Sequence, residues 1–234
     1  MVSSFSIMPS NPKKKMCKVY KVIVLGDSGV GKSTLLHRMA DSDAPANDNT
    51  RKDYLSKVTI VEDAPAPVKV QLWDTAGQEK FGAARLPSSF FRHADAALVV
   101  YDVTDRKSFV GVLQWVLQLQ AHRSTAAEDS AFSLILVGHK SEVSDTVRQV
   151  GEEEGRAVAK LMAASHFLEC SSIDGTNIQA CFDAVATTLV HASCKDLGQP
   201  ANTAAKTKDL FTLLAPNSDV SSLNALLSPS LEIP

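Results

Sequence analysis

The segment at residues 26–33, GDSGVGKS, constrains the fold of this chain more than any other part of its sequence. It matches the pattern GxxxxGK[ST], and it stands between an apolar run at 19–25 and a helix-favouring run at 32–40. Glycines allow backbone amides to approach a phosphate closely, and a helix N-terminus adds partial positive charge. A glycine-rich turn without function is the alternative, but the strand and helix on either side disfavour it. The segment therefore predicts a P-loop for a nucleoside triphosphate.

Two side chains at the end of this segment suit triphosphate chemistry. Lys32 can place a cation on the β and γ phosphates, which makes it a candidate catalytic residue as well as a ligand. The Ser33 hydroxyl is a hard oxygen ligand of the kind that Mg²⁺ prefers. The residues predicted to contact nucleotide here are Gly26, Asp27, Ser28, Gly29, Val30, Gly31, Lys32, Ser33 and Thr34.

The apolar pattern from residue 18 to about 192 alternates short strand-like runs with longer helical ones, which predicts an α/β fold with a mostly parallel sheet and helices on both faces. The Pro-rich stretch at 63–67 suits a hairpin tip and predicts that the second and third strands are antiparallel. The predicted strands are 19–25, 56–62, 68–73, 96–103, 133–137 and 167–170, and the predicted helices are 32–40, 108–122, 152–164 and 177–189.

Composition bounds the remaining possibilities. We expect a flexible leader at 1–17, one domain at 18–192 and a mostly disordered tail at 193–234, whose apolar islands at 210–214 and 223–227 could alternatively dock on the domain or a partner. A net charge of -2 predicts no nucleic-acid binding, and no apolar run is long enough to span a membrane. The 4 cysteines are scattered without CxxC spacing, as expected of reduced thiols.

The end of the third predicted strand supplies a second group of candidates, in the run WDTAGQE at 73–79. Because carboxyl ends of parallel strands meet at one edge of a sheet, Asp74 should lie near the P-loop and orient magnesium. Gly77 offers a backbone amide to a γ-phosphate, and Gln78 has the donor and acceptor needed to hold an attacking water. We therefore expect Gln78 to be the second catalytic residue.

Together these motifs resemble the Ras superfamily of small GTPases, and within it the Rab branch, over about residues 18–190. The resemblance rests on WDTAGQEKF at 73–81, FFR at 90–92, VYDVT at 100–104 and RKSF at 106–109. It implies a P-loop NTPase G domain with a six-stranded sheet, GTP and GDP as ligands with Mg²⁺, slow hydrolysis, and effector and regulatory proteins as partners. It also implies a trafficking role in the cytoplasm, with any attachment to endomembranes made through a protein partner.

The guanine-binding motifs of that family are altered here. Its Asn-Lys-x-Asp motif aligns with the run HKSE, in which His139 replaces an amide that tethers the P-loop and Lys140 can lie over the base. Glu142 keeps the carboxylate that would accept hydrogen bonds from guanine but adds a methylene, which leaves a P-loop kinase or ATPase as a further alternative. In the last base-contacting loop, Ser171 is followed by Ser172 and Ile173, where the family has Ala-Lys.

The run APANDNTRKDY at 44–54 is the segment least like the family's switch I. With two residues deleted, Asn49 or Thr50 falls at the magnesium-binding threonine, which makes Thr50 a candidate metal ligand beside Ser33 and Asp74. No aromatic residue falls over the base, and switch II is two residues longer than usual. The main alternative to a switch is therefore a degenerate, non-switching nucleotide-binding scaffold that acts through protein interactions.

Three aromatic residues match the effector surface of Rab proteins, namely Tyr54, Trp73 and Phe90. Packing on the sheet beneath the switches is the equal alternative, because aromatic side chains serve both purposes. Trp115 is interpreted as packing.

The chain ends SPSLEIP, so we expect no prenylated cysteine at its C-terminus.

Overall fold

The computed structural model describes residues 18–40, 54–62, 64–75, 86–124 and 132–195. These ranges contain a six-stranded sheet with the order β2-β3-β1-β4-β5-β6, in which every neighbouring pair is parallel except β2 and β3. The prediction of a mostly parallel sheet with one antiparallel pair is confirmed. The strands are β1 (Lys18–Leu25), β2 (Tyr54–Thr59), β3 (Val68–Trp73), β4 (Ala96–Asp102), β5 (Ser133–His139) and β6 (His166–Cys170).

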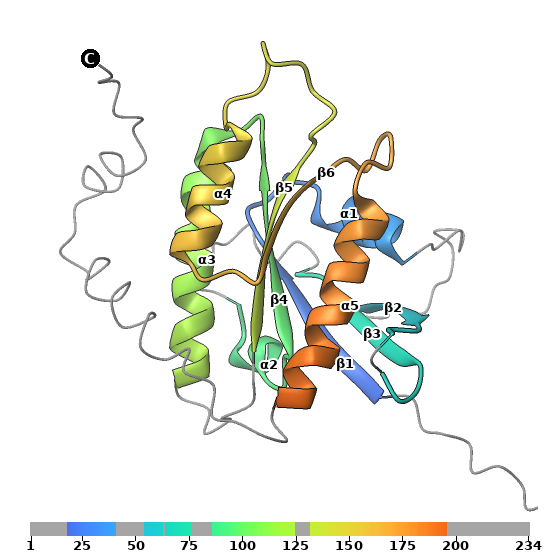
Figure 1. Cartoon of the computed structure of the whole chain (residues 1–234). Helices are drawn as coiled ribbons and strands as arrows, with labels where there is room; N and C mark the ends of the chain where they lie inside the picture. Colours follow the sequence, from blue (N-terminus) through green and yellow to red (C-terminus); the bar gives the residue numbers. More distant parts are fainter. Residues whose placement is uncertain (1–17, 41–53, 63, 76–85, 125–131, 196–234) are drawn as a thin grey trace, which may run out of the picture.

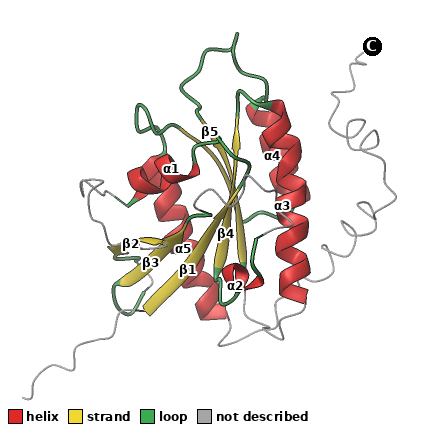
Figure 2. Ribbon diagram, turned by 180° about the vertical axis from the view of Figure 1, so that it is seen from behind, coloured by secondary structure: helices red, strands yellow, loops and turns green. Residues whose placement is uncertain are grey.

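Helices cover both faces of the sheet, as predicted. In Figures 1 and 2, α1 and α5 lie on one side of the strands, and α3 and α4 lie on the other. The helices are α1 (Lys32–Met39), α2 (Ser88–Phe91), α3 (Arg106–Ser124), α4 (Glu152–Leu161) and α5 (Ile178–Lys195). None of those helices combines the length and the hydropathy needed to cross a bilayer.

The central strands are apolar throughout because both of their faces are buried. In β1, Val22 and Val24 join the core beneath α1 and α5, whereas Ile23 and Leu25 join the core beneath α3 and α4. All four side chains are fully buried. This division follows from the two-residue period of a strand, and it fixes the carboxyl end of β1 and therefore the start of the loop at 26–31.

Element ends differ from prediction where a local contact outweighs the periodic pattern. Helix α3 starts two residues before the predicted 108, because the Asp105 carboxylate accepts a hydrogen bond from the Lys107 amide at 2.9 Å and caps the helix. Asn177 has a φ of 56°, so α5 begins one residue later than predicted. Helix α5 also continues to Lys195, three residues past the predicted domain boundary at 192. The short helix α2 was not predicted.

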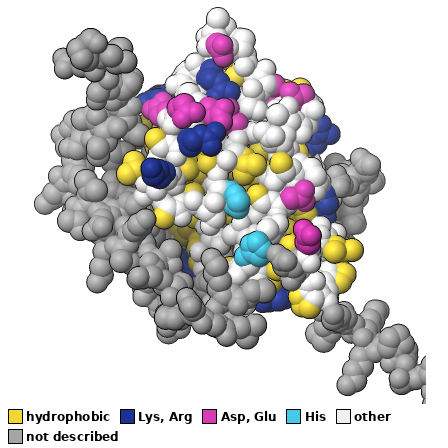
Figure 3. All heavy atoms as spheres, in the orientation of Figure 1, with side chains coloured by type: hydrophobic (Ala, Val, Ile, Leu, Met, Phe, Trp, Pro, Cys, Tyr) yellow, Lys and Arg dark blue, Asp and Glu magenta, His cyan; other side chains and the backbone are white. Residues whose placement is uncertain are grey.

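Charges of both signs are interspersed on the face in Figure 3, where dark blue and magenta side chains lie side by side. At the start of α4, Arg156 contacts Glu152 at 2.5 Å, and Arg106 contacts Glu154 at 2.5 Å. Among the described residues this face therefore carries paired charges rather than a field of one sign.

Candidate nucleotide-binding site

The loop between β1 and α1 has a backbone shape that its glycines make possible. Gly26 has a φ of 144°, and a Cβ there would lie 2.2 Å from the Val100 carbonyl oxygen. Gly31 has a φ of 94°, and a Cβ there would lie 2.5 Å from the His139 ring. Side chains are thus excluded at both ends of the loop, which brings its backbone against β4 on one side and β5 on the other.

Lys32 folds back over this loop. Its side chain is 4% exposed, and its ammonium donates to the carbonyl oxygens of Gly26 at 2.9 Å and Asp27 at 2.7 Å. Helix α1 has Gly31 at its N-cap, no side-chain cap and no acidic residue in its first turn. No acidic side chain of the first turn therefore accepts hydrogen bonds from the first amides of α1. A helix N-terminus of this kind can bind an anion.

The two predicted metal ligands of the described chain lie in contact. The Ser33 hydroxyl donates a hydrogen bond to Asp74 Oδ2, although 41 residues separate them. Asp74 Oδ1 is buried without a hydrogen-bond partner. A hydroxyl and a carboxylate with an unpartnered oxygen are the hard oxygen donors that Mg²⁺ prefers, so these residues fit that ion. Thr50, Gly77 and Gln78 lie outside the described residues.

The base end of the site is assembled from β4, β5 and the loops that follow them. Lys140 donates to the Gly29 carbonyl at 3.1 Å and forms an ion pair with Asp102 at 2.5 Å. Burial alone would raise the pKa of Asp102, but hydrogen bonds from Lys140 and Thr104 outweigh it and hold that pKa below its ordinary value. The aliphatic part of Lys140 is thereby fixed beside the P-loop.

Glu142 and Ser171, the residues predicted to contact guanine, lie in the loops that follow β5 and β6. Glu142 Oε2 is buried and has no hydrogen-bond partner, so this carboxylate keeps an accepting oxygen available. Ser171 is fully buried, and its hydroxyl oxygen accepts from the amides of Ile173 at 3.1 Å and Asp174 at 3.3 Å. His139 links this end to the P-loop, with Nδ1 2.7 Å from the Val30 carbonyl oxygen. The imidazole therefore contacts the P-loop at the position where the resemblance implies an amide.

Comparisons with known proteins agree with this geometry. The family model for the Ras family matches residues 21–191. The chain belongs to the Rab branch of the Ras superfamily of small GTPases. It is 35% identical to the Ras-related protein RABA2b of Arabidopsis thaliana over 76% of this chain and 78% of that protein. It is 37% identical to RABA5e of the same plant over 76% and 78%, and 37% identical to the Ras-related protein RIC1 of Oryza sativa subsp. japonica over 80% and 87%.

The aromatic residues predicted for the effector surface of this Rab-branch protein lie together. The rings of Tyr54 and Trp73 stack with centroids 4.9 Å apart. The Lys21 ammonium lies 4.7 Å from the Trp73 ring and 5.9 Å from the Phe90 ring, and it donates to the Phe90 carbonyl at 2.7 Å. Tyr54, Trp73 and Phe90 are each partly exposed. Tyr54 stacks on Trp73, and Lys21 joins Trp73 to Phe90, while part of each aromatic surface stays open.

Sequence reasoning missed several residues of this small GTPase that hold the nucleotide loops. Trp115 was interpreted as packing, but its indole N–H also donates to Asp27 Oδ1 at 2.8 Å, which ties α3 to the P-loop. Arg38 at the end of α1 donates to the carbonyl oxygens of Ser172 at 2.9 Å and Ile173 at 3.3 Å. Neither contact has a local sequence signal, because each joins segments 88 to 135 residues apart.

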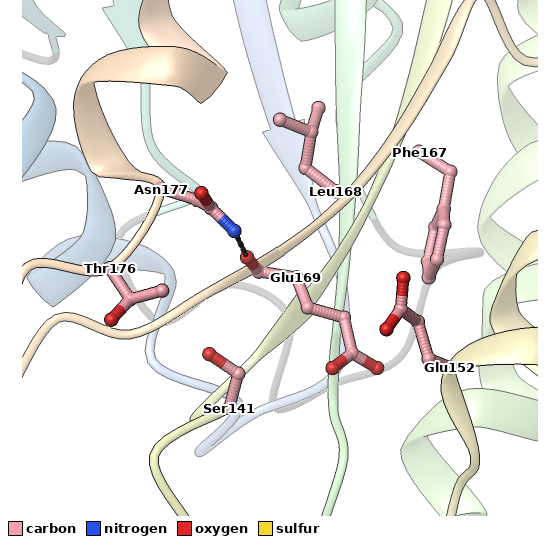
Figure 4. Close-up of a pocket in the computed structure, with 7 residues that line it drawn as sticks. All are labelled: Ser141, Glu152, Phe167, Leu168, Glu169, Thr176 and Asn177. Carbon is pink, nitrogen blue, oxygen red and sulfur yellow. Dashed lines mark hydrogen bonds between the residues drawn. The ribbon is translucent and has the colours of Figure 1, made fainter.

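A separate open pocket of about 350 Å³ lies at the outer edge of β6. Figure 4 shows Asn177 donating to the Glu169 carbonyl oxygen, a bond of 2.8 Å, with the Glu152 carboxylate nearby. The Glu169 carboxylate is paired with Arg148 at 2.8 Å. None of the lining residues is among those predicted to bind nucleotide, and they are Ser141, Glu152, Phe167, Leu168, Glu169, Thr176 and Asn177.

Proposed function

We propose that this chain binds GTP and GDP with Mg²⁺ and acts as a nucleotide-dependent switch in intracellular membrane trafficking, with slow hydrolysis of GTP. The observation that carries the proposal is the contact between Ser33 and Asp74 beside the buried Lys32, with Asp74 Oδ1 left unpartnered. Lys32 and Ser33 come from the P-loop, and Asp74 comes from the end of β3. Together they have the charges and donor types that a magnesium triphosphate requires.

Each residue of the phosphate end has a distinct role in this proposal. Backbone amides of the loop at 26–31 and the first turn of α1 receive the phosphates, and Lys32 exchanges its carbonyl partners for phosphate oxygens. Ser33 and Asp74 hold Mg²⁺, which when bound neutralises charge on the phosphates. Gly77 and Gln78 are proposed to contact the γ-phosphate and to position the attacking water.

Guanine is the base that the other end of the site favours. The unpartnered Oε2 of Glu142 offers an acceptor to the ring nitrogen and amino group of guanine, whereas adenine presents no such pair of donors there. Lys140 would lie over the base, and Ser171 with the backbone amides of Ser172 and Ile173 would support the guanine oxygen. This assignment supports GTP over ATP.

The proposed partners are effector and regulatory proteins that read the nucleotide state. Tyr54, Trp73 and Phe90 form the proposed effector surface, supported by the stacking of Tyr54 on Trp73, by the Lys21 ammonium beside Trp73 and Phe90, and by the partial exposure of all three rings. We place the protein in the cytoplasm, at endomembranes where a protein partner recruits it.

A non-switching scaffold is the second candidate function. It is favoured by the sequence at 44–54, which offers only Asn49 or Thr50 at the magnesium-binding position and no aromatic residue for the base. Loops ordered by the γ-phosphate are what make a GTPase a switch, so a chain without that ligand would bind nucleotide without signalling its state.

Nucleotide titration separates these functions. The nucleotide content of the purified full chain is measured first, followed by titration with labelled GDP and GTP, with and without Mg²⁺, and with ATP as competitor. A switch predicts guanine selectivity and tighter GTP binding with Mg²⁺. Equal GDP and GTP affinity without any effect of Mg²⁺ would support the scaffold, and ATP competing as well as GTP would contradict guanine selection.

A further inference from the structure

The base-contacting loop at 171–173 is held rigidly from two directions. Arg38 of α1 donates to the carbonyl oxygens of Ser172 at 2.9 Å and Ile173 at 3.3 Å. Within the loop, the Ser171 hydroxyl oxygen accepts from the Ile173 amide at 3.1 Å. These bonds fix the backbone of Ser172, so its side-chain hydroxyl is presented in a defined place.

That hydroxyl meets the ring of His139. Ser172 Oγ lies 2.7 Å from His139 Nε2, and His139 Nδ1 lies 2.7 Å from the Val30 carbonyl oxygen. The ring is 3% exposed and packs against Gly31, where a Cβ would lie 2.5 Å from it. A single buried imidazole therefore joins the P-loop to the base-contacting loop.

The chemistry of these two contacts defines which tautomer the ring adopts. A carbonyl oxygen only accepts, so Nδ1 carries the proton that is donated to Val30. In a neutral ring Nε2 is then an acceptor, and the Ser172 hydroxyl donates to it. Without that hydroxyl, the Val30 carbonyl would still hold the proton on Nδ1, but the buried Nε2 would be left without a hydrogen-bond donor.

We propose that Ser172 is a positioning residue that donates to the buried Nε2 of His139 and holds the ring in place, so that the pair clamps the P-loop to the base-contacting loop and slows nucleotide release. The proposal rests on the proposed function, because the release that it slows is that of bound guanine nucleotide. The family that the sequence resembles normally has an amide side chain at the position of His139 and an alanine at the position of Ser172. The imidazole brings a second ring nitrogen that an amide tether lacks, and Ser172 satisfies it.

The charged surroundings of the ring agree with a neutral imidazole. Burial lowers the pKa of His139, against an opposing effect of its hydrogen bond to Val30. Glu142 and Asp102 would raise that pKa and Lys140 lowers it further. The net lowering keeps Nε2 unprotonated and able to accept from Ser172 at neutral pH.

Four variants of the full chain test this clamp. Ser172→Ala removes the hydroxyl, and Ser172→Thr keeps it. His139→Asn restores an amide beside Ser172, and a double variant combines His139→Asn with Ser172→Ala. Ser144→Ala is the matched control, because its hydroxyl is exposed and contacts only Thr146 among the described bonds of that loop. Two quantities are measured: the Nε2 resonance of His139, by nitrogen–proton NMR of the histidine rings, and the dissociation rate of labelled GDP.

Ser172→Ala should shift the Nε2 resonance of His139, because that nitrogen loses its hydrogen-bond donor, and should raise GDP dissociation about 5- to 10-fold. Ser172→Thr and Ser144→Ala should match the wild type in both measurements. In the His139→Asn background the ring is absent, so removal of the Ser172 hydroxyl should change the GDP dissociation rate less than about 2-fold.

An unchanged Nε2 resonance in Ser172→Ala would overturn the proposal, and so would an equal change in dissociation in both backgrounds. The NMR measurement needs no nucleotide. A protein that binds no GDP but shows the shifted Nε2 resonance would contradict the proposed function while leaving the role of Ser172 in holding the ring intact.

Discussion

The phosphate end and the base end of the site are built in different ways. At the phosphate end, Lys32 donates to carbonyls only 5 and 6 residues away, and the loop bends through its own glycines. At the base end, His139 and Arg38 reach partners across separations of 33 to 134 residues. The P-loop is shaped largely by its own residues, with distant support from Asp74 and Trp115, whereas the base end is a junction of distant segments.

This difference explains where the chain departs from its family. The run at 26–33 keeps the full P-loop pattern, because each residue of it depends on its neighbours and on phosphate. The departures at His139, Glu142 and Ser172 lie at the junction, where a change in one segment can be balanced by a change in another. We therefore expect substitutions at the phosphate end to abolish binding and those at the base end to adjust it.

The largest effect should come from Lys32→Ala. Loss of a buried cation from the phosphates should weaken GDP and GTP binding at least ~100-fold, because charge-assisted hydrogen bonds to phosphate are among the strongest contacts available. Isothermal titration measures the loss. Lys160→Ala, an exposed lysine on α4, is the control and should bind normally. Binding within a few-fold of wild type would show that the P-loop does not hold the triphosphate.

Asp74→Asn should have the next largest effect, and it concerns magnesium. The amide keeps the size of the side chain but loses the charge, so the affinity of GTP in the presence of Mg²⁺ should fall about 10- to 100-fold, as for other groups that orient a metal ligand. Without Mg²⁺ the variant and the wild type should bind GTP alike. The exposed Asp183→Asn serves as control. A similar loss with and without Mg²⁺ would exclude a metal role for Asp74.

The sequence predicted much of the fold because its signals are local. Apolar runs predicted all six strands of the sheet, and the Pro-rich segment predicted the antiparallel β2–β3 pair. Ser33 and Asp74 were predicted to meet from the rule that parallel strands end at one edge, and they lie in contact. The phosphate end was thus predictable from a motif together with a strand order.

The contacts at the base end could not be predicted in the same way. That His139 faces Ser172 depends on the relative placement of the β5 and β6 loops, and the Trp115–Asp27 bond depends on which side of α3 meets the P-loop. Neither arrangement has a periodic signal. The early start of α3 also depended on a single side chain, the cap at Asp105.

Glu142→Asp would test whether the extra methylene at the base end weakens guanine recognition. A shorter carboxylate should restore a second hydrogen bond to guanine and tighten GDP about tenfold, the value of roughly one such bond. Glu153→Asp on the exposed face of α4 provides the matched control. If Glu142→Asp leaves GDP affinity unchanged, the departure in this motif is compensated and weak binding would originate at 44–54.

Trp115→Phe should affect stability more than binding. The phenyl ring fills most of the buried site but cannot donate to Asp27 Oδ1, which costs about 1 kcal/mol of unfolding free energy. Urea denaturation measures the change. In an Asp27→Ala background the same substitution should cost less, because the bond is already lost. Equal costs in both backgrounds would mean that Trp115 acts only by packing.

The smallest effect should be a pH dependence of stability that comes from His139. Its pKa is lowered in the folded protein, mainly by burial, so the unfolded chain takes up the proton first as pH falls below the ordinary value of 6.5. The stability contributed by the neutral ring is therefore complete above that pH and is lost as pH falls toward the folded-state pKa. Asp102 contributes separately. Because its pKa is lowered in the folded protein, the stability that its carboxylate contributes is lost only as pH falls below the ordinary value of 3.8.

Thermal denaturation of the wild type and His139→Asn between pH 7.5 and 5 would isolate this effect, a range chosen to lie around the ordinary histidine pKa of about 6.5. The other histidines are common to both proteins, so the difference in melting temperature reports His139 alone. This difference should change in favour of His139→Asn as pH falls. A constant difference would mean that the ring takes up its proton equally in the folded and unfolded states.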